Sequence, residues 1–301
     1  MKLIKPSYEI LNQPPGLQGI YEQIELAGRT CYASSHKIQY QENDTCNGFI
    51  STTAKDFVDR MIKSQHYAML EHGTVYLCII PTEYGMFVNT DEIKDIVDRY
   101  KNNPYSKVIE YPKQPGYAVT TNYRVLVENG WLYDLKYLCE PTEFHEKRIT
   151  VRFTTDRGVS HEFVRHRVFS FAQESTRYCN YSKDKFGNEL TFIIPSWMDS
   201  NEQSINTKQG FGIKPGEELF AFLGKSERHY FKLLELGWTP QQARQVLPNA
   251  LKTELVMTGF VSDWSHFFDL RAKGTTGAPH PDAKALAEPL MEEFYKRGYI
   301  K

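Results

Sequence analysis

The sequence predicts an α+β (mixed α/β) fold, with strands in its first half and a mainly helical second half. Residues 74–80 predict a buried strand because they are apolar on both faces. Residues 149–153 alternate apolar and polar side chains, which is typical of a half-buried strand. Most other periodic segments carry the spacing of helices. Since no linker separates two parts of the chain, we predict a single domain over residues 1–301.

Helices are predicted wherever apolar residues recur at intervals of three and four positions. Two helix starts are marked by capping residues: Ser160, before a helix that leads into Arg165, and Thr239, before Pro240. The predicted helices span residues 16–29, 53–69, 91–101, 124–137, 217–236, 240–258, 262–270 and 282–297. The predicted irregular connections are residues 105–117 and 180–216.

Composition and charge indicate a soluble cytoplasmic protein. Of 301 residues, 24% are charged and 41% are hydrophobic, and the formal net charge is −1. This charge argues against broad electrostatic binding to nucleic acid. Neither the N-terminus nor any later segment has the apolar run of a signal peptide or a membrane span. An odd number of cysteines without a Cys-x-x-Cys pair favours reduced thiols over a disulfide framework: Cys31, Cys46, Cys78, Cys139 and Cys179.

The most informative segment is residues 165–178, which read Arg-His-Arg-Val-Phe-Ser-Phe-Ala-Gln-Glu-Ser-Thr-Arg-Tyr. It combines three permanent cations, a histidine and two serine hydroxyls with apolar spacers. A guanidinium cannot lose its charge in a protein, and its planar fork fits phosphate and carboxylate. The segment therefore indicates a partly buried site for nucleotide phosphates. A surface ion-pair cluster with Glu162 and Glu174 is the alternative.

The spacing does not support two other kinds of site. His161 and His166 lie five residues apart, whereas zinc on a helix needs histidines four apart, so we expect no metal site. Ser175 lacks the Gly-x-Ser-x-Gly turn of a serine hydrolase. We therefore interpret Ser175 as a hydrogen-bond donor to a bound phosphate.

The order of these residues is similar to the signature of the flavin-dependent thymidylate synthases. The matching residues are Arg165-His166-Arg167, Ser175 and Arg177-Tyr178, with flanking Ser160-His161-Glu162 and Cys179-Asn180-Tyr181-Ser182. Residues 27–32, 66–72, 243–248 and 264–271 also resemble the family and follow its order. A pattern with this many polar identities rarely arises by chance, unlike a lone glycine fingerprint.

The resemblance implies a central, mostly antiparallel sheet with flanking helices and a helical C-terminal half. It implies a homotetramer with active sites shared between subunits, and insertions near residues 82–140 and 183–215. The implied reaction is reductive methylation of dUMP to dTMP, with methylenetetrahydrofolate as carbon donor, FAD as cofactor and NADPH as reductant. The alternatives are another flavin- or nucleotide-dependent enzyme on the same fold, or a non-catalytic nucleotide- or RNA-binding protein.

The resemblance also assigns residues to FAD. Cations near the pyrimidine edge of a flavin stabilise its anionic reduced form, which gives the arginine cluster a physical role. For Cys31, a buried free thiol is an equally good alternative. The implied FAD-binding residues are Cys31, His66, Glu71, Arg165, His166, Arg167, Gln173 and His266. The chain departs from common family residues at Ala68, Gln173, Phe260, Ser262 and His266. The departures at Phe260 and Ser262 imply that part of the adenine-end binding must differ.

The residues implied to bind dUMP all lie in the second half of the chain. Arg244 would hold the phosphate, and Arg271 would act catalytically by stabilising charge that develops on the uracil. No cysteine is identified as a nucleophile, since Cys179 is the nearest and has no evident base beside it. The implied dUMP-binding residues are Glu162, Phe163, Val164, Arg165, Gln173, Glu174, Ser175, Thr176, Arg177, Arg244 and Arg271.

Overall fold

The computed structural model describes residues 1–43, 48–80, 90–198 and 214–301, so Cys46 and parts of both predicted insertions lie outside the described residues. The α-helices are α1 (Gly16–Cys31), α2 (Ala54–Lys63), α3 (Thr90–Lys101), α4 (Tyr123–Asn129), α5 (Arg157–Phe163), α6 (Pro215–Glu235), α7 (Pro240–Ala243), α8 (Val261–Phe268) and α9 (Pro281–Lys296). Shorter helical turns are η1 (Ser35–Lys37), η2 (Tyr67–His72), η3 (Leu132–Tyr137), η4 (Asp184–Phe186), η5 (Arg244–Val246) and the π-helical η6 (Asp269–Lys273).

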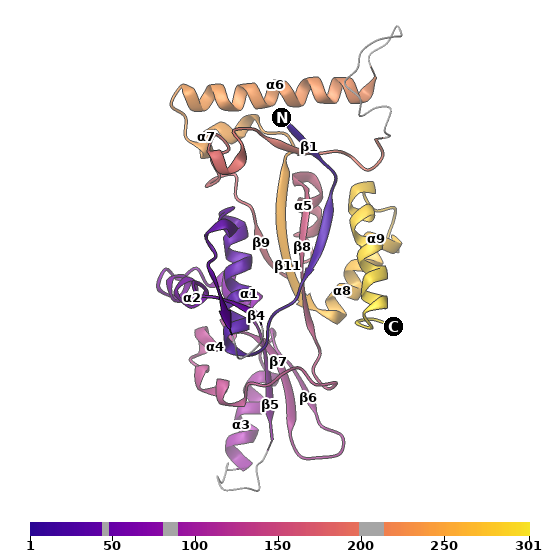
Figure 1. Ribbon diagram of the computed structural model, residues 1–301. Helices are drawn as coiled ribbons and strands as arrows, with labels where there is room; N and C mark the ends of the chain where they lie inside the picture. The colour runs from indigo at the N-terminus through magenta and orange to yellow at the C-terminus, as the bar shows by residue number, and fades with distance from the viewer. Residues whose placement is uncertain (44–47, 81–89, 199–213) are drawn as a thin grey trace.

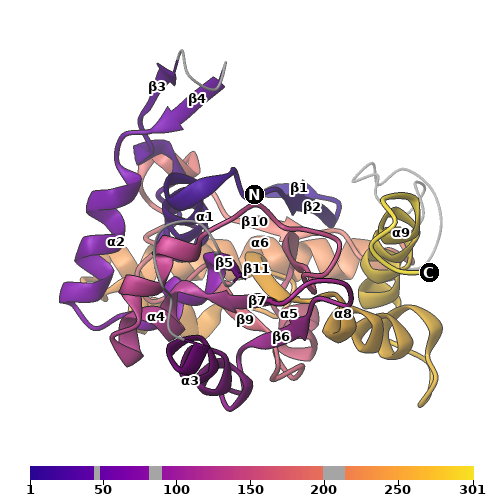
Figure 2. The same ribbon diagram turned by 90° about the horizontal axis from the view of Figure 1, so that it is seen from below.

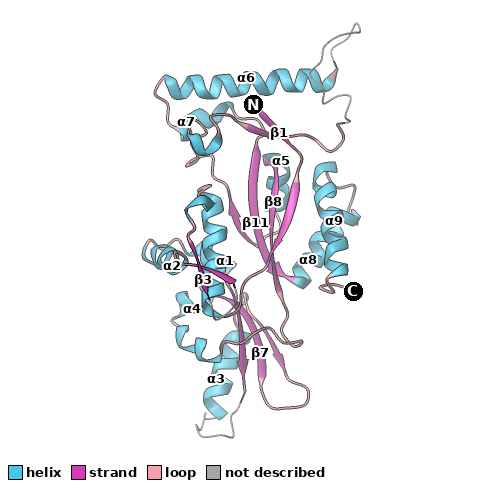
Figure 3. Cartoon of the chain, viewed as in Figure 1, coloured by secondary structure: helices cyan, strands magenta, loops and turns pink. Residues whose placement is uncertain are grey.

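The centre of the molecule is a four-stranded sheet in the order β2-β8-β11-β9, and every pairing in it is antiparallel. Its long strands β8 and β11 run side by side through the middle of the molecule (Figure 1 and Figure 3). This confirms the predicted mixed fold and its antiparallel central sheet. The strands are β2 (Ser7–Leu11), β8 (Arg148–Asp156), β9 (Ser170–Gln173) and β11 (Lys252–Phe260).

Helices cover both faces of this sheet. On one face, Val256 packs in a core cluster with Ile24 of α1 and Leu70 of η2. On the other face, Leu255 packs with Trp264 of α8 and with residues of α9. Neighbouring positions of β11 thus enter opposite cores, as side chains of a strand must. The aromatic cluster under α8 adds edge-to-face ring contacts, including Phe153, Phe163 and Phe267.

The helix predicted over residues 240–258 is wrong. Helix α7 and the turn η5 end before Pro248, which has no amide proton to continue the ladder, and β11 follows. Because β11 is buried on both faces, its apolar residues show no polar alternation and resemble a buried helix. The rest of the second half is mainly helical, and α6 and α9 lie within one to two residues of their predicted bounds at each end.

Two other predicted helices are interrupted by residues with positive φ. The predicted helix 53–69 is divided into α2, which ends at Lys63, and the turn η2. Gln65, between them, has φ +56°. The predicted helix 124–137 ends at Gly130, which has φ +70°, and η3 follows. Left-handed residues of this kind terminate α-helices because they turn the chain away from the helix axis.

Two strands of the first predicted insertion join β5, which precedes it, in a separate sheet at the end of the molecule opposite α6 (Figure 1). Its strand order is β5-β7-β6, all antiparallel, so the predicted irregular connection 105–117 is partly a strand. Asp134 of η3 ties the sheet's helices together by accepting hydrogen bonds from Arg99 and Tyr100 of α3. The strands are β5 (Thr74–Ile79), β6 (Lys107–Glu110) and β7 (Tyr117–Asn122).

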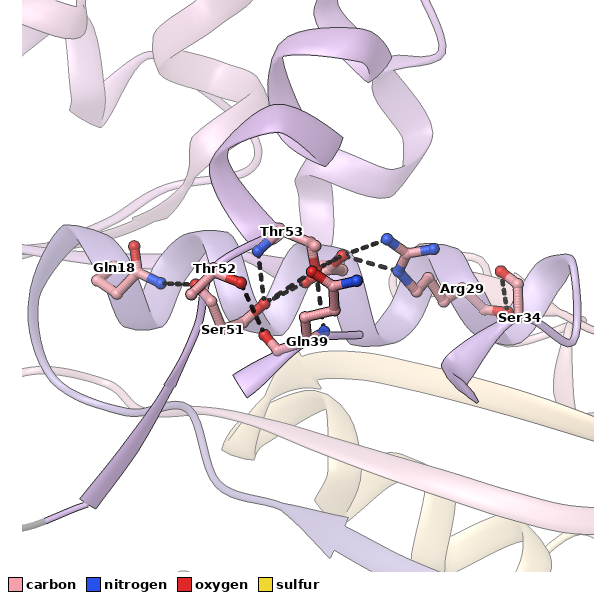
Figure 4. A network of polar contacts seen from close by, with 8 residues as sticks. Gln18, Arg29, Ser34, Gln39, Ser51, Thr52 and Thr53 are labelled. Carbon is pink, nitrogen blue, oxygen red and sulfur yellow. Dashed lines mark hydrogen bonds and ion pairs between the residues drawn. The ribbon is translucent and has the colours of Figure 1, made fainter. Parts of the chain in front are cut away.

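The buried carboxylate of Glu25, in the middle of α1, anchors a two-stranded hairpin formed by β3 (Tyr40–Asn43) and β4 (Gly48–Ser51). It accepts hydrogen bonds from Arg29, from Ser51 at 2.7 Å and from Thr53 at 2.8 Å. Figure 4 shows the surrounding polar residues, and Figure 2 shows the hairpin extending away from α1. A second small sheet pairs β1 (Lys2–Ile4) with β10 (Thr191–Ile193) beneath α6. Strand β10 belongs to the segment 180–216, which was predicted to be an irregular connection.

Candidate functional site

Arg271 is the centre of a hydrogen-bonded cluster just after α8. It lies in the π-helical turn η6, and its side chain is 17% exposed. Its Nη1 donates to Oε2 of Glu162 at 2.5 Å, and its Nη2 donates to the carbonyl oxygen of the same residue at 2.9 Å. Its Nε donates to Nε2 of His166 at 3.1 Å. Arg271 thereby contacts two predicted site residues, Glu162 and His166, which precede it by 109 and 105 positions.

His166 is neutral in this cluster. Its Nε2 accepts the hydrogen bond from Arg271, so that nitrogen carries a lone pair rather than a proton. Burial, followed by the charges of Arg271 and His266, lowers the pKa of His166 to about 4. The ring centroid of His266 lies 6.2 Å from that of His166, so a second predicted FAD residue belongs to the same cluster.

Helix α5 carries Glu162 into the cluster, and its start differs from the prediction. The N-cap is Asp156, whose side chain accepts a hydrogen bond from the amide of Val159 at 2.9 Å. Ser160 lies buried inside the helix, where its hydroxyl accepts a hydrogen bond from Nε2 of Gln173 at 2.8 Å. The predicted N-cap at Ser160 is therefore wrong, and α5 ends at Phe163, before Arg165.

The end of β9 joins the predicted substrate motif to α1. Gln173 is the last residue of β9, and its side chain reaches Ser160 of α5 as described above. Two residues on, the amide of Ser175 donates to the carbonyl oxygen of Cys31 at 3.0 Å. Cys31, which was predicted from a distant part of the sequence, thus lies beside the motif.

Arg177 and Arg244 lie at the same edge of the molecule. Nε of Arg177 donates to Oε1 of Gln241 in α7 at 2.7 Å, and Arg244 begins η5 directly after α7. Both arginines are exposed, and neither forms an ion pair with a carboxylate of the described residues. Two unneutralised guanidinium groups at one edge can bind a phosphate.

Glu71 and Arg167 line a cavity of ≈ 640 Å³. This volume falls within the range of small-molecule sites. Arg148, at the start of β8, also lines the cavity, and so does Arg124 of α4. Sequence reasoning missed both of these arginines. One feature of the sequence could have identified Arg148: it directly precedes the predicted strand 149–153. A charged residue is seldom buried at such a position.

Several predicted site residues have structural roles. Phe163 is fully buried in the aromatic core, and Thr176 is also buried. The carboxylate of Glu174 accepts hydrogen bonds from Tyr181 at 3.0 Å and from Lys252 at 2.8 Å, and lines a different cavity of ≈ 400 Å³. The remaining predicted residues are Val164, which is half-buried, Arg165, which is exposed, and His66, the half-buried N-cap of η2.

The described cysteines are free, and burial protonates three of them. Burial raises the pKa of Cys31 to about 11 and that of Cys179 to about 12, and it also raises the pKa of Cys139. A thiolate, not a thiol, is the nucleophile in cysteine catalysis. These three side chains are therefore unsuited to attack a substrate at neutral pH.

One cluster in the described part of the chain has the residue types of a metal site. Side-chain ligand atoms of Cys78, Cys139 and His145 lie within 4.8 Å of one another. However, Nδ1 of His145 accepts a hydrogen bond from the amide of Thr142 at 3.0 Å, and its Nε2 donates to the carbonyl oxygen of Leu77 at 3.2 Å. Both nitrogens are thus already used, so we assign no metal to the cluster.

Residues 129–297 match the family model described as "Thymidylate synthase complementing protein". The chain belongs to this family. The matched segment contains the Arg271 cluster, the arginine motif and Arg244. Cys31, His66 and Glu71 lie outside the matched segment. Only their positions in the structure therefore bear on their predicted roles in FAD binding.

Curated relatives of the family are similar to this chain over large parts of their length. The "Probable flavin-dependent thymidylate synthase" of Paramecium bursaria Chlorella virus 1 is 30% identical over 156 residues, covering 50% of this chain and 69% of the relative. The "Flavin-dependent thymidylate synthase" of Thermococcus kodakarensis is 29% identical over 216 residues, covering 65% and 80%. The predicted family resemblance is confirmed, and the protein is an enzyme of this type.

A solved structure aligns with nearly the whole chain. It is a UMP/dUMP methylase PolB from Streptomyces cacaoi bound with 5-Br dUMP, and the alignment covers 98% of this chain and 93% of that one at 15% identity. The TM-score of 0.43 is too low to support a conclusion. In the part of the chain that the structure describes, no helix has both the length and the apolar character needed to cross a membrane.

Proposed function

We propose that this enzyme methylates dUMP to dTMP, taking the methylene carbon from methylenetetrahydrofolate and the electrons from NADPH by way of FAD. The observation that carries the proposal is the fixed position of Arg271. Its guanidinium is held by both the side chain and the backbone of Glu162 and by His166, yet its side chain keeps 17% exposure. A cation held in this way can stabilise negative charge without reorganising when the charge develops.

The residues of this chain divide the work between binding and activation. We assign Arg177 and Arg244 to the dUMP phosphate because they are exposed, adjacent and without a carboxylate partner among the described residues. Arg271 then polarises the uracil so that C5 can attack the methylene group of the folate. The carboxylate of Glu162 offsets part of the charge of Arg271, which sets the strength of that polarisation.

The residues around the ≈ 640 Å³ cavity fit a flavin dinucleotide. Arg167 lines the cavity, is exposed and has no ion-pair partner among the described residues. Arg148 is a buried cation in the same wall. An anionic cofactor would neutralise both. When bound, the flavin supplies hydride transfer, whereas the protein contributes its position and the surrounding charge.

The protonated cysteines favour this route over one that needs a protein nucleophile. The classical way to activate uracil adds a thiolate at C6 of the ring. Cys179 is the cysteine nearest the motif, but it is buried and its pKa is raised to about 12. Activation by Arg271 requires no thiolate. Free thiols in the described residues also agree with a reducing, cytoplasmic location.

We further propose a homotetramer whose active sites combine residues of neighbouring subunits. Arg165, Arg177 and Arg244 are exposed, and the large side chains of Val168 and Tyr178 beside them are 65% and 58% exposed. Apolar groups of this kind are commonly covered in an assembly. Mixing Arg244→Ala subunits with Arg271→Ala subunits tests the composite site. Recovery of part of the activity in mixed oligomers supports it, and complete inactivity of the mixture contradicts it.

The reaction itself is tested by anaerobic single turnover. Photoreduced protein is mixed with dUMP and methylenetetrahydrofolate, while flavin absorbance is recorded and dTMP is measured by chromatography. We expect flavin reoxidation and dTMP formation together, and no dTMP when dUMP is omitted. Bound flavin without dTMP would favour another flavin enzyme. A protein without flavin would favour the non-catalytic nucleotide binder.

A further inference from the structure

Arg148 is a buried cation without a buried anion. Its side chain is 9% exposed, and it forms no ion pair with a carboxylate among the residues that the structure describes. Its guanidinium donates instead to neutral acceptors: the carbonyl oxygen of Glu71 at 3.0 Å and the hydroxyls of Thr74 and Ser170 at 3.3 and 3.4 Å. Burial lowers its pKa only to about 10, so it remains charged at neutral pH.

A charge in this position is costly unless a ligand neutralises it. Removing an ion from water carries a desolvation penalty of several kcal/mol that neutral hydrogen bonds only partly offset. Arg148 is not sealed in the interior, because it lines the ≈ 640 Å³ cavity. An anion that enters the cavity can therefore reach it.

The cavity has two walls of different origin. The family core supplies Arg148, Arg167 and Phe260, whereas the predicted insertion supplies Tyr105 and Arg124. Arg124 is already neutralised, since it pairs with Glu71 at 2.6 Å and with Glu128 at 2.8 Å. Lys107, which also lines the cavity, pairs with Glu146 at 3.6 Å, so Arg148 and Arg167 are the lining cations without an ion-pair partner among the described residues. The carboxylate of Asp263 lines the cavity too and favours the charged form of Arg148, but the two form no ion pair.

The aromatic groups of the cavity complete its chemistry. The guanidinium of Arg148 lies over the ring of Phe260, 5.6 Å from its centroid, and Nζ of Lys107 lies 5.4 Å from the same ring. Tyr105 stands at the cavity with its side chain 64% exposed. Two free cations beside exposed aromatic surface match a diphosphate joined to a purine, because bases stack on aromatic rings.

One departure of this chain from common family residues, at Phe260, lies in this cavity. Ser262, two residues further on, is not among the residues that line the cavity, and its hydroxyl donates to Oε1 of Glu146 at 2.5 Å. Residues of the insertion line the same cavity, and Nζ of Lys107 lies over the ring of Phe260. The adenosine end of the cofactor can thus find its contacts in the insertion.

We propose that Arg148 anchors the diphosphate of FAD and that Tyr105, from the insertion, stacks on its adenine. This inference rests on the proposed function, since it names the subsite for the cofactor of that reaction. It assigns the insertion a role in dinucleotide binding and distinguishes the two ends of FAD. The flavin ring itself gains nothing from Arg148 or Tyr105.

The test compares FAD with riboflavin, which lacks both phosphate and adenosine. Affinities are measured by fluorescence titration of flavin-free protein, with ADP as a competitor. We expect Arg148→Met to weaken FAD and ADP by at least about tenfold, the loss of one charge-assisted hydrogen bond, and to leave riboflavin unchanged. Arg152→Met is the matched control, because Arg152 lies on the same strand but pairs with Glu9, away from the cavity.

Tyr105→Ala is a second test in case replacement of the buried Arg148 disturbs folding. The side chain of Tyr105 is exposed and is not needed for the core. It should weaken FAD severalfold without changing riboflavin, while circular dichroism shows an unchanged fold. Equal losses for FAD and riboflavin, or no loss in either variant, would overturn the proposed subsite. If the parent protein binds neither flavin, the proposed function fails. If the parent binds both equally, the function survives and only the subsite is wrong.

Discussion

Arg271 donates its Nε proton to Nε2 of His166 across 3.1 Å, and this bond fixes the protonation state of the histidine. A guanidinium nitrogen can only donate, so the imidazole nitrogen must accept. The charge of Arg271 and burial both oppose a proton on the ring. Arg271 and His166 are thus coupled: one supplies a fixed positive charge, and the other stays neutral to orient it.

The first prediction is that the protein loses stability in mild acid through its buried histidines. The pKa of His166 is lowered to about 4 and that of fully buried His72 to about 3, chiefly by burial. Between about pH 6.5 and pH 4 the unfolded chain binds protons that the folded chain does not, so stability falls as pH falls. Above about pH 6.5 these groups add no pH dependence.

Denaturant unfolding of the parent and of His166→Gln across this range checks the prediction. The variant should show a shallower loss, by up to about 1.4 kcal/mol per pH unit in unfolding free energy. His229→Gln is the control, because His229 lies exposed on α6. Identical slopes for the parent and His166→Gln would mean that His166 does not titrate as described.

The second prediction separates Arg244 from Arg271. Arg244 is exposed and unpaired with any described carboxylate, so Arg244→Ala should fold normally and raise the KM for dUMP by about tenfold or more. Arg271→Ala should also lower kcat, because the charge it stabilises develops only in the transition state. Steady-state kinetics at saturating folate and NADPH measure both effects. Normal turnover of Arg271→Ala at saturating dUMP would make Arg271 a binding residue only.

The third prediction concerns replacement of Arg271 by lysine. A guanidinium makes three separate hydrogen bonds here, two to Glu162 and one to His166. An ammonium keeps the charge but loses the planar fork that satisfies them together. Arg271→Lys should therefore recover only part of the kcat that Arg271→Ala loses. Full recovery would show that charge alone matters and that the geometry of the cluster does not.

The fourth prediction is that no single cysteine is essential. Burial keeps Cys31, Cys139 and Cys179 protonated, so none of them supplies a ready thiolate. Each cysteine of the chain is changed to alanine or serine in turn, and dTMP formation is measured together with flavin content. We expect measurable turnover in every variant. One inactive variant with its fold and FAD intact would refute the mechanism.

The fifth prediction compares two glycines inside helices. Gly28→Ala in α1 would place a Cβ 2.5 Å from the ring of Phe57. This ring is buried, and the guanidinium groups of Arg29 and Arg60 lie 5.3 and 5.6 Å from its centroid. Overpacking of this kind costs about 1–3 kcal/mol, which outweighs the gain of about 1 kcal/mol in helix propensity. Gly224→Ala in α6 meets no atom within 4 Å and should stabilise. Urea unfolding decides both signs, and a stabilised Gly28→Ala would contradict the packing.

Local patterns were reliable where one side of an element faces solvent. Helices α1, α3 and α6 lie close to their predicted bounds because amphipathic spacing reports directly on burial. The strand β11 was missed for the opposite reason. Its side chains enter two different cores, so its sequence carries no alternation, and only pairing with β8 and β9 reveals a strand.

The sequence by itself determined the arginine motif and the family of this chain, because both follow from residue types and their order along the chain. Only the tertiary structure decided which residues meet. Arg271 and Glu162 are 109 residues apart, and nothing in their spacing foretells the contact between them. Arg148 is buried among residues distant from it in sequence, and its guanidinium donates hydrogen bonds to Glu71, Thr74 and Ser170. Such contacts depend on packing between elements, whereas a sequence pattern reports the environment of one element at a time.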